Sequence, residues 1–178
     1  MTTQNNWINQ ESIPSDLILA KNLIFDFCDI DCTQPQPEAE SKEYDAYRFT
    51  LNKKEICYRS AKITPTKTGQ FVTLWKRNND GIIEPFDFSD AIDFVLVNVR
   101  KNDLFGQFIF PKEILLAKGV FSTTNKEGKR ATRVYPPWDE TTNKQAEKTQ
   151  KWQLEYFLSI PNQDAVDLNK AKKLLQLH

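Results

Sequence analysis

The sequence predicts one α/β domain of the mixed (α+β) kind, with a mixed central β-sheet flanked by helices. Its 178 residues suit a single core, which at this size buries roughly 70% of the surface of the unfolded chain. Hydrophobic residues make up 39% and aromatic residues 12%, as is typical of a globular protein. Segments with helical periodicity also interleave with segments that alternate every second residue. We therefore expect a single domain over residues 1–178, with residues 1–10 as a flexible N-terminal arm.

The first third of the chain is predicted to contain a helix, a loop and a strand. Apolar residues recur at helical spacing after Ser15, which predicts a helix over residues 17–28. Paired prolines and polar residues make 32–43 a surface loop. Residues 44–51 alternate between apolar and polar, as a half-buried strand does. Residues 11–45 hold nine acids and two lysines, which predicts one acidic side of the molecule.

The middle of the chain is predicted to form the sheet. Residues 55–63 and 70–77 have strand character, and 71–75 is apolar on both faces, as expected of a central strand. Residues 92–99 form the clearest buried strand, so we expect the sheet to centre on them.

The last part of the chain is predicted to add a strand, a basic loop and three helices. Residues 105–110 have strand character, and a proline and a glycine bound a short helix over 111–119. Residues 122–133 form a polar, basic loop that leads into a short strand. Helical spacing then predicts a long helix over 142–160 and a terminal amphipathic helix over 164–177.

Positive charge is concentrated in two stretches of a chain that holds 24 basic and 24 acidic residues overall. Residues 53–77 carry seven cations and one acid, and residues 100–133 carry eight cations and three acids. Binding to a phosphate backbone requires cations beside hydroxyls, amides and aromatic faces. We therefore predict non-catalytic binding of nucleic acid, either DNA or RNA, through Arg59, Lys62, Lys67, Gln70, Trp75, Lys76 and Arg77, with Lys129, Arg130, Arg133 and Trp152 as a second contact region.

The competing explanation of these cations is that lysines cover strand ends and loops in proteins of every function. The neutral balance of the chain favours this explanation, because most nucleic-acid-binding domains are strongly basic.

Several kinds of reactive site are excluded by composition. The one histidine is the last residue, His178, so a Ser-His-Asp or Cys-His centre has no well-placed general base. Three cysteines without a further histidine are too few ligands for a tetrahedral zinc site, and no glycine loop that cradles phosphates occurs. We therefore expect no cofactor, no metal and no catalytic residue.

An acidic segment leaves one metal-binding alternative open. Asp87, Asp90 and Asp93 are spaced three apart and could line one side of a helical turn, as ligands of Mg²⁺ would. Helix capping and solvation explain the same residues more simply.

No membrane partner is expected. No apolar run approaches the ~20 residues that span a bilayer, and the N-terminus lacks the pattern of a signal peptide. These features predict a cytoplasmic location, and the small, odd number of cysteines agrees with a reducing compartment.

Six stretches, which include Val-Tyr-Pro-Pro-Trp and are spread over the chain beyond its first 40 residues, carry a resemblance to a known family: 58–77, 84–90, 99–112, 125–130, 134–138 and 149–156. The resemblance is to the MepB-like family, small bacterial proteins often encoded with multidrug-efflux genes. It implies a fold similar to the core of restriction-endonuclease-like nucleases, and by analogy of fold a link to nucleic acid.

Active nucleases of that type hold Mg²⁺ with an Asp on one strand and an Asp/Glu-x-Lys motif on the next. Residues 60–62 and 73–76 carry hydroxyls and cations where those acids would stand, and neither Asp45 nor Glu55 begins an acid-x-Lys motif. The resemblance therefore implies binding without metal-dependent cleavage.

Two other functions remain open. The first is an enzyme, either a remnant nuclease or an enzyme that modifies a small phosphorylated or nucleoside-like ligand. Such a ligand would bind in a pocket lined by Arg59, Lys62, Gln70 and Trp75. Alternatively, the chain is a protein-interaction partner whose acidic and basic faces pair with another copy or another component. The sequence leaves the oligomeric state undetermined.

Overall fold

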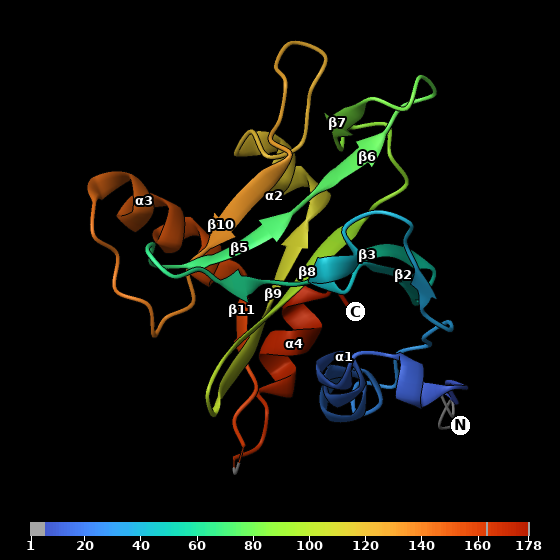
Figure 1. Ribbon diagram of the computed structural model, residues 1–178. Helices are drawn as coiled ribbons and strands as arrows, with labels where there is room; N and C mark the ends of the chain where they lie inside the picture. Colours follow the sequence, from blue (N-terminus) through green and yellow to red (C-terminus); the bar gives the residue numbers. More distant parts are fainter. Residues whose placement is uncertain (1–5, 163, 178) are drawn as a thin grey trace.

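A mixed sheet of six strands forms the centre of the computed structural model, which describes residues 6–162 and 164–177 (Figure 1). The strand order is β1-β2-β3-β8-β9-β11, in which β3 and β8 run parallel and every other neighbouring pair runs antiparallel. The bounds are β1 Gln36–Pro37, β2 Tyr47–Leu51, β3 Lys54–Ser60, β8 Phe94–Lys101, β9 Leu104–Pro111 and β11 Phe157–Ser159. The predicted single α+β domain with a mixed central sheet is confirmed.

Strand β8 lies inside this sheet, where the uninterrupted apolar run predicts the centre. It pairs with β3 on one side and with β9 on the other, and residues 94–99 are all buried. A strand covered on both faces needs apolar side chains on both, which is why its residues do not alternate.

Helices from the two ends of the chain cover one face of the sheet. They are α1 Ser15–Ala20, the π-helical turn η2 Lys21–Phe25 and α4 Leu168–Leu174, with the short 3₁₀ turn η1 Gln10–Ser12 preceding α1. Leu17, Phe25 and Ala171 pack there against Tyr58 and Leu96 of the sheet. The predicted first helix is confirmed over most of its length, and the terminal helix is shorter than predicted because Asp167 caps its start.

A second, smaller layer covers the other face. It contains the three-stranded sheet β10-β5-β4 and two helices: β4 Lys62–Ile63, β5 Gln70–Thr73, β10 Ala131–Val134, α2 Lys112–Ala117 and α3 Lys144–Gln153. A hairpin of β6 Trp75–Arg77 and β7 Ile83–Pro85 extends from this layer (Figure 1). Val72 and Phe121 pack against Val97 and Phe108 of the central sheet. The 3₁₀ turns η3 Lys42–Tyr44 and η4 Leu154–Tyr156 complete the elements.

The prediction that residues 71–75 form a central strand covered on both faces is corrected, because β5 is the middle strand of the small sheet and is buried on one face only. The chain leaves the main sheet after β3, and β5 joins the small sheet, where Val72 and Leu74 are buried while Phe71 and Thr73 are half-buried. Phe71 is half-buried because its ring packs under the Arg133 guanidinium, which lies 5.7 Å from the ring centre. A half-exposed aromatic ring of this kind cannot be told from a core ring by composition.

The predicted helix over residues 142–160 is also corrected. Helix α3 ends at Gln153, and Phe157–Ser159 form strand β11 on the edge of β9. Phe157 packs on Phe108 and Trp138, with ring centres 5.0 and 5.8 Å apart. The apolar residues in this segment fit both periods, and pairing with β9 satisfies backbone groups that would otherwise form an open sheet edge.

Residues 1–5 of the predicted N-terminal arm lie outside the described residues. Trp7 is buried and packs edge-on against Phe49 with ring centres 6.0 Å apart. The backbone of Ile8 exchanges two hydrogen bonds with the Gln34 side chain, so residues 7 and 8 are attached to the domain. Among the described residues, no helix has the length and apolar character needed to cross a membrane.

Candidate nucleic-acid interface

Two of the predicted contact residues, Arg59 and Gln70, lie inside the domain. Arg59 is 1% exposed, and its guanidinium donates hydrogen bonds to Glu38 and to two backbone carbonyls at 2.9 and 3.1 Å. The Gln70 side chain is equally buried and donates to the carbonyl of Arg100 at 3.2 Å. Both side chains hold the central sheet and the small layer together. Their assignment to a ligand surface is therefore corrected, because neither presents its polar group to solvent.

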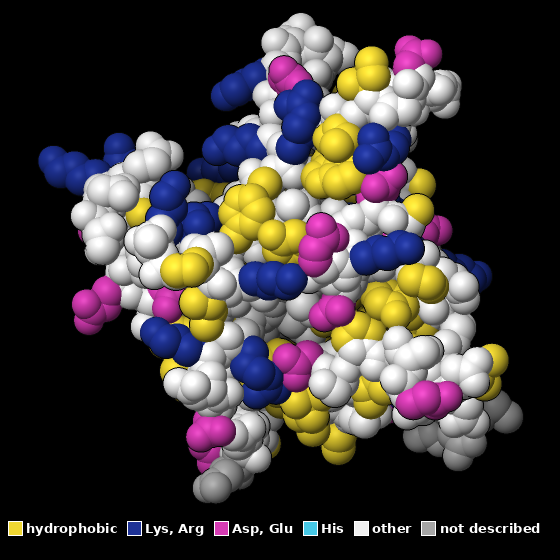
Figure 2. Space-filling model, viewed as in Figure 1, with side chains coloured by type: hydrophobic (Ala, Val, Ile, Leu, Met, Phe, Trp, Pro, Cys, Tyr) yellow, Lys and Arg dark blue, Asp and Glu magenta, His cyan; other side chains and the backbone are white. Residues whose placement is uncertain are grey.

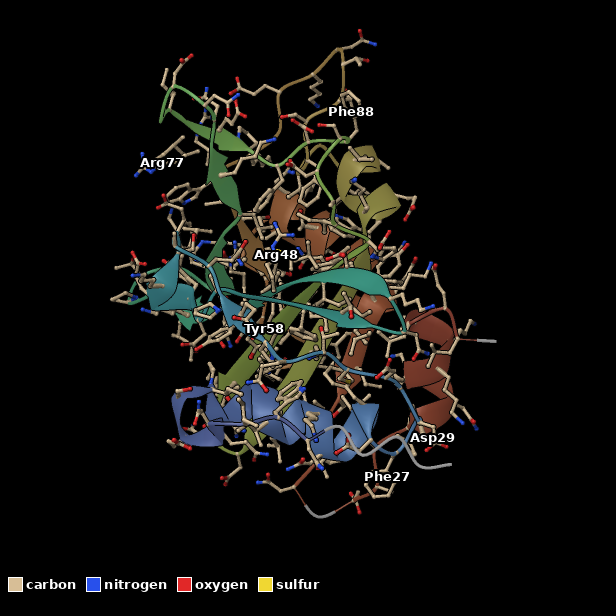
Figure 3. The ribbon with its side chains drawn as sticks, turned by 90° about the vertical axis from the view of Figure 1, so that its right-hand side faces the viewer. Phe27, Asp29, Arg48, Tyr58, Arg77 and Phe88 are labelled. Atoms are coloured by element: carbon tan, nitrogen blue, oxygen red, sulfur yellow. The ribbon has the colours of Figure 1, made fainter. Side chains whose placement is uncertain are left out.

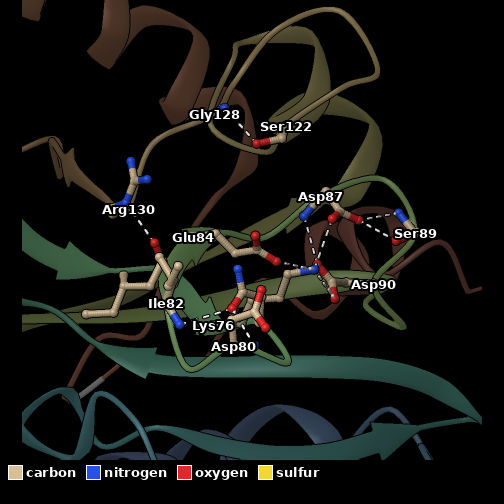
Figure 4. Close-up of polar contacts among 12 residues, drawn as sticks. Lys76, Asp80, Ile82, Glu84, Asp87, Ser89, Asp90, Ser122, Gly128 and Arg130 are labelled. Carbon is tan, nitrogen blue, oxygen red and sulfur yellow. Dashed lines mark hydrogen bonds and ion pairs between the residues drawn. The ribbon is translucent and has the colours of Figure 1, made fainter.

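Lys76 is also occupied, in this case by a cluster of acids. Its ammonium lies 2.9 Å from Asp87, 2.8 Å from Asp90 and 3.6 Å from Glu84 (Figure 4). Burial lowers the pKa of Lys76, but the hydrogen bonds to Asp90 and Asp87 outweigh burial and raise it. Lys76 is thus a charged internal counter-ion, and the place considered for Mg²⁺ is taken by an ammonium group.

The other acids considered for metal binding lie apart. Asp93 accepts a hydrogen bond from the backbone N–H of Glu55 at 2.8 Å, outside the Lys76 cluster. Glu55 lies near the turn between β2 and β3, whereas Asp45 lies before the start of β2, toward the opposite end of this hairpin. Within the described part of the chain, no group of three or more His, Cys, Asp or Glu residues is placed to hold a metal ion.

The Lys76 cluster makes stability depend on acid pH. Burial raises the pKa of Asp87, but hydrogen bonds from Ser89 and Lys76 outweigh burial and lower it from 3.8 to about 2. A folded-state pKa below the unfolded one stabilises the fold above pH 4, and this contribution disappears as the pH falls from 4 toward 2. Allowing for solvent screening, we expect Asp87 to contribute about 1 kcal/mol.

Urea unfolding between pH 7 and 2 measures this contribution. The Asp87→Asn variant should be less stable than the wild type at pH 7, and the difference should shrink below pH 4. A constant difference over the whole range would show that Asp87 acts through its shape and not through its charge.

The other cations of the predicted first region are spread over the surface. Lys67 is exposed in a loop, and Lys62 lies over the Tyr44 ring, 5.1 Å from its centre. Arg77 lies over Trp75 and binds Glu40 at 2.7 Å, at the outer edge of the molecule (Figure 3). Of the first region, the structure brings together only Trp75, Lys76 and Arg77, which line a hollow of about 280 Å³ together with three acids.

Three of the four residues of the second predicted region are brought together. Lys129, Arg133 and Trp152 border two adjoining hollows of about 230 and 260 Å³ between β10, α3 and the end of α2. We call this surface the basic concavity; the residues that line it are Phe71, Lys118, Val120, Lys129, Ala131, Thr132, Arg133, Tyr135, Gln145, Lys148, Thr149 and Trp152. Lys and Arg side chains gather around α3, β10 and the loop before β10 on the face shown in Figure 2.

Two elements with different periods build the walls of the basic concavity. Asn143 caps α3 by accepting a hydrogen bond from the Ala146 N–H at 2.8 Å. From this start, α3 places Gln145, Lys148, Thr149 and Trp152 on one side, because residues three and four apart share a helix face. Strand β10 supplies the facing wall and is held in register by its antiparallel pairing with β5.

The cations of the basic concavity have few acidic neighbours. Its lining contains four cations and no Asp or Glu, and among the described residues Lys118, Lys129 and Lys148 form no ion pair. Arg133 is fixed by a 2.8 Å hydrogen bond to Thr64 and by longer ones to two backbone carbonyls. Arg130, in contrast, pairs with Glu127 at 2.9 Å and is not part of the lining. The concavity can therefore attract an anion without first breaking an ion pair.

Comparison with known proteins identifies the family. A family model described as MepB-like matches residues 38–159, which is more than half of the chain. The chain belongs to the MepB-like family. The matched residues of this MepB-like chain include the whole lining of the basic concavity, whereas α1 and α4 lie outside them.

A solved structure supports the same assignment. The MepB-like chain is similar to the protein in "Crystal Structure of MepB", with 33% sequence identity and a TM-score of 0.73. The match covers 85% of this chain and 100% of that one. No curated protein matches the chain.

Two cations of the basic concavity, Lys118 and Lys148, were not among the predicted contact residues. Lys118 is the C-cap residue that follows the short helix α2, and no charged residue stands next to it in the sequence. Lys148 lies four residues before Trp152, and the helical period places both on one face of α3.

Proposed function

We propose that this MepB-like protein binds nucleic acid without cutting it, through the basic concavity. The observation that carries the proposal is that four cations line two adjoining hollows whose lining holds no carboxylate. A cytoplasmic location, where nucleic acid is present, is part of the proposal.

The groups around the basic concavity match a phosphodiester chain. Lysine ammonium groups replace the counter-ions of phosphates, and hydroxyl and amide groups such as those of Thr132, Thr149 and Gln145 hydrogen-bond phosphate or sugar oxygens. Elsewhere on the described surface, Arg77 and Arg130 pair with acids, and Lys76 is enclosed by them. These paired cations attract a polyanion less strongly, since each would have to break an existing ion pair before it could bind a phosphate.

Binding without cleavage is supported by the arrangement of the acids. The cluster of Asp87, Asp90 and Glu84 already holds a cation, because the Lys76 ammonium lies among the three carboxylates. Asp45 and Glu55 lie toward opposite ends of one hairpin and do not form a two-carboxylate site. We expect no cleavage of DNA or RNA in Mg²⁺. Cleavage that is lost in Asp87→Asn or Glu55→Gln would contradict this part of the proposal.

The salt dependence of binding tests the proposed function. We expect the double variant Lys129→Ala/Lys148→Ala to bind a fluorescein-labelled 20-nucleotide DNA at least 10-fold more weakly at low salt, measured by fluorescence anisotropy. The plot of log affinity against log salt concentration should become less steep by about 1.5, since each lost phosphate contact reduces the steepness by roughly 0.7–0.9.

A matched control removes two lysines on the opposite side of the central sheet. Lys170 and Lys173 are exposed on α4, which packs on the other face from α3. Lys170→Ala/Lys173→Ala lowers the net charge equally and should leave affinity within about twofold. Equal losses in both double variants would show attraction to net charge alone, and no binding by the wild type at low salt would refute the proposed function.

A further inference from the structure

Trp152 gives the basic concavity a feature that charge alone does not require. Its indole borders the hollow of about 230 Å³ and packs against Phe110 of the sheet, with ring centres 5.5 Å apart. The Lys118 ammonium lies 5.8 Å from the ring centre. One aromatic neighbour in the core therefore fixes the ring, while a flexible cation lies over it.

We propose that the basic concavity holds unpaired bases, with one base stacked on Trp152, so that the protein prefers single-stranded to double-stranded nucleic acid. This inference rests on the proposed function and specifies its ligand. Stacking on an aromatic side chain tolerates every base, because every base has a π-face, and it requires that the base be unpaired.

The size of the hollows favours a single strand. Neither hollow reaches the roughly 300–1,000 Å³ of pockets that enclose drug-sized molecules. A duplex keeps its bases stacked inside the helix and would meet this surface with phosphates only. A single strand places its bases individually, so that one base enters a small hollow.

The order of groups along the surface matches consecutive nucleotides. The two hollows share Lys129, Thr132, Gln145 and Thr149, and each has its own aromatic wall. Trp152 borders the first hollow, and Phe71 and Tyr135 border the second. In this arrangement a base lies in each hollow, and the phosphate between them lies at Lys129.

Lys118 and Lys148 belong to the first hollow only, which Trp152 also borders. A base that stacks on the indole displaces the Lys118 ammonium from the ring, and this ammonium then meets the adjoining phosphate. The exchange of a cation–π contact for a charge-assisted phosphate contact keeps the lysine partnered.

Direct comparison of single and double strands tests the inference. We expect the wild type to bind a labelled 12-nucleotide oligothymidine at least 10-fold more tightly than a 12-base-pair hairpin duplex at the same salt concentration. Trp152→Leu should weaken oligothymidine binding by about 5- to 150-fold, the range reported for loss of one base–aromatic stack. Its affinity for the duplex should stay unchanged, and Trp152→Phe should retain most of the single-strand affinity.

Trp138→Leu provides the matched control. Trp138 is half-buried, as Trp152 is, and packs on Phe157 with ring centres 5.8 Å apart, outside the lining of the basic concavity. This variant also removes an indole that packs on a core phenylalanine, and it should leave both affinities unchanged. Because Trp152 also packs on Phe110, a second readout uses the folded Trp152→Phe variant: oligothymidine should quench tryptophan fluorescence in the wild type and much less in this variant.

The outcomes separate the inference from the proposed function. Equal binding of single strand and duplex, or an unchanged preference in Trp152→Leu, overturns base stacking and leaves phosphate binding intact. Absence of binding to either nucleic acid overturns both.

Discussion

Glu38→Ala is expected to lower the free energy of unfolding by about 3–5 kcal/mol, the range for breaking a buried ion pair by removing one partner. Glu38 accepts hydrogen bonds from Arg59 and from Arg48, the latter at 2.7 Å. Arg59 is 1% exposed, so water does not replace a partner that its guanidinium loses. Without Glu38, its guanidinium retains two backbone carbonyls but no negative charge.

Glu40→Ala is the matched control for this prediction. Glu40 lies two residues along the chain and pairs with Arg77 at 2.7 Å, but the side chains of this pair are 32% and 47% exposed. An exposed pair contributes only about 0–1 kcal/mol, so this variant should be close to the wild type. Urea unfolding followed by circular dichroism measures both. Equal effects in the two variants would mean that Arg59 does not depend on Glu38 for its burial.

Gly128→Ala is expected to cost about 3 kcal/mol and to weaken nucleic-acid binding as well, since overpacking in a tight site typically costs 1–3 kcal/mol or more. A Cβ at Gly128 would lie 2.3 Å from the carbonyl oxygen of Val120 and 2.7 Å from backbone atoms of Phe121 and Ser122. These atoms belong to the backbone, so the loop itself must move apart. The hydrogen bond from the Gly128 N–H to Ser122 (Figure 4) and the next one, from Lys129 to Val120, hold this crossing closed.

Lys129, a residue of the basic concavity, follows Gly128 directly, so a shift of this loop also moves Lys129.

Gly81→Ala is the control, because a Cβ there meets nothing within 4 Å and only the positive φ of 78° is unfavourable. A left-handed conformation costs a non-glycine residue roughly 1–2 kcal/mol, and Gly81 lies on the β6–β7 hairpin outside the lining. Thermal unfolding and anisotropy should show a larger stability loss for Gly128→Ala and an affinity loss for that variant alone. If the Gly128→Ala protein were destabilised but bound DNA with unchanged affinity, binding would not depend on the geometry of this loop.

The elements that could be predicted from sequence are those whose burial follows one pattern along the whole segment. Residues 94–99 are buried on both faces, so their apolar run identifies the centre of the sheet without knowledge of any neighbour. The first helix has one buried side and shows it by its period. The segment ending at Phe157 could not be resolved in this way, because its apolar residues satisfy a helix and a strand alike until the open edge of β9 is known.

The candidate site could likewise be predicted only in part. A lysine or arginine is visible in the sequence, but its partner is not when many residues separate the two. Arg59 meets Glu38 from 21 positions earlier, and Lys76 meets Asp90 from 14 positions later. The cations on 59–77 therefore resemble a single basic surface in the sequence, although the fold buries Arg59 and pairs Lys76 and Arg77 with acids. Trp152 and Lys129, by contrast, face one surface although different elements carry them.

The sequence by itself determined the mixed α+β class, the buried central strand, the resemblance to MepB-like proteins and the two stretches in which positive charge is concentrated. Only the tertiary structure decided which of those charges remain available to a ligand. The physical reason is that the availability of a charge depends on its burial and on the nearest opposite charge, and both are set by contacts between distant segments. Those contacts bury Arg59 and enclose Lys76, and they leave Lys118, Lys129 and Lys148 around one concavity.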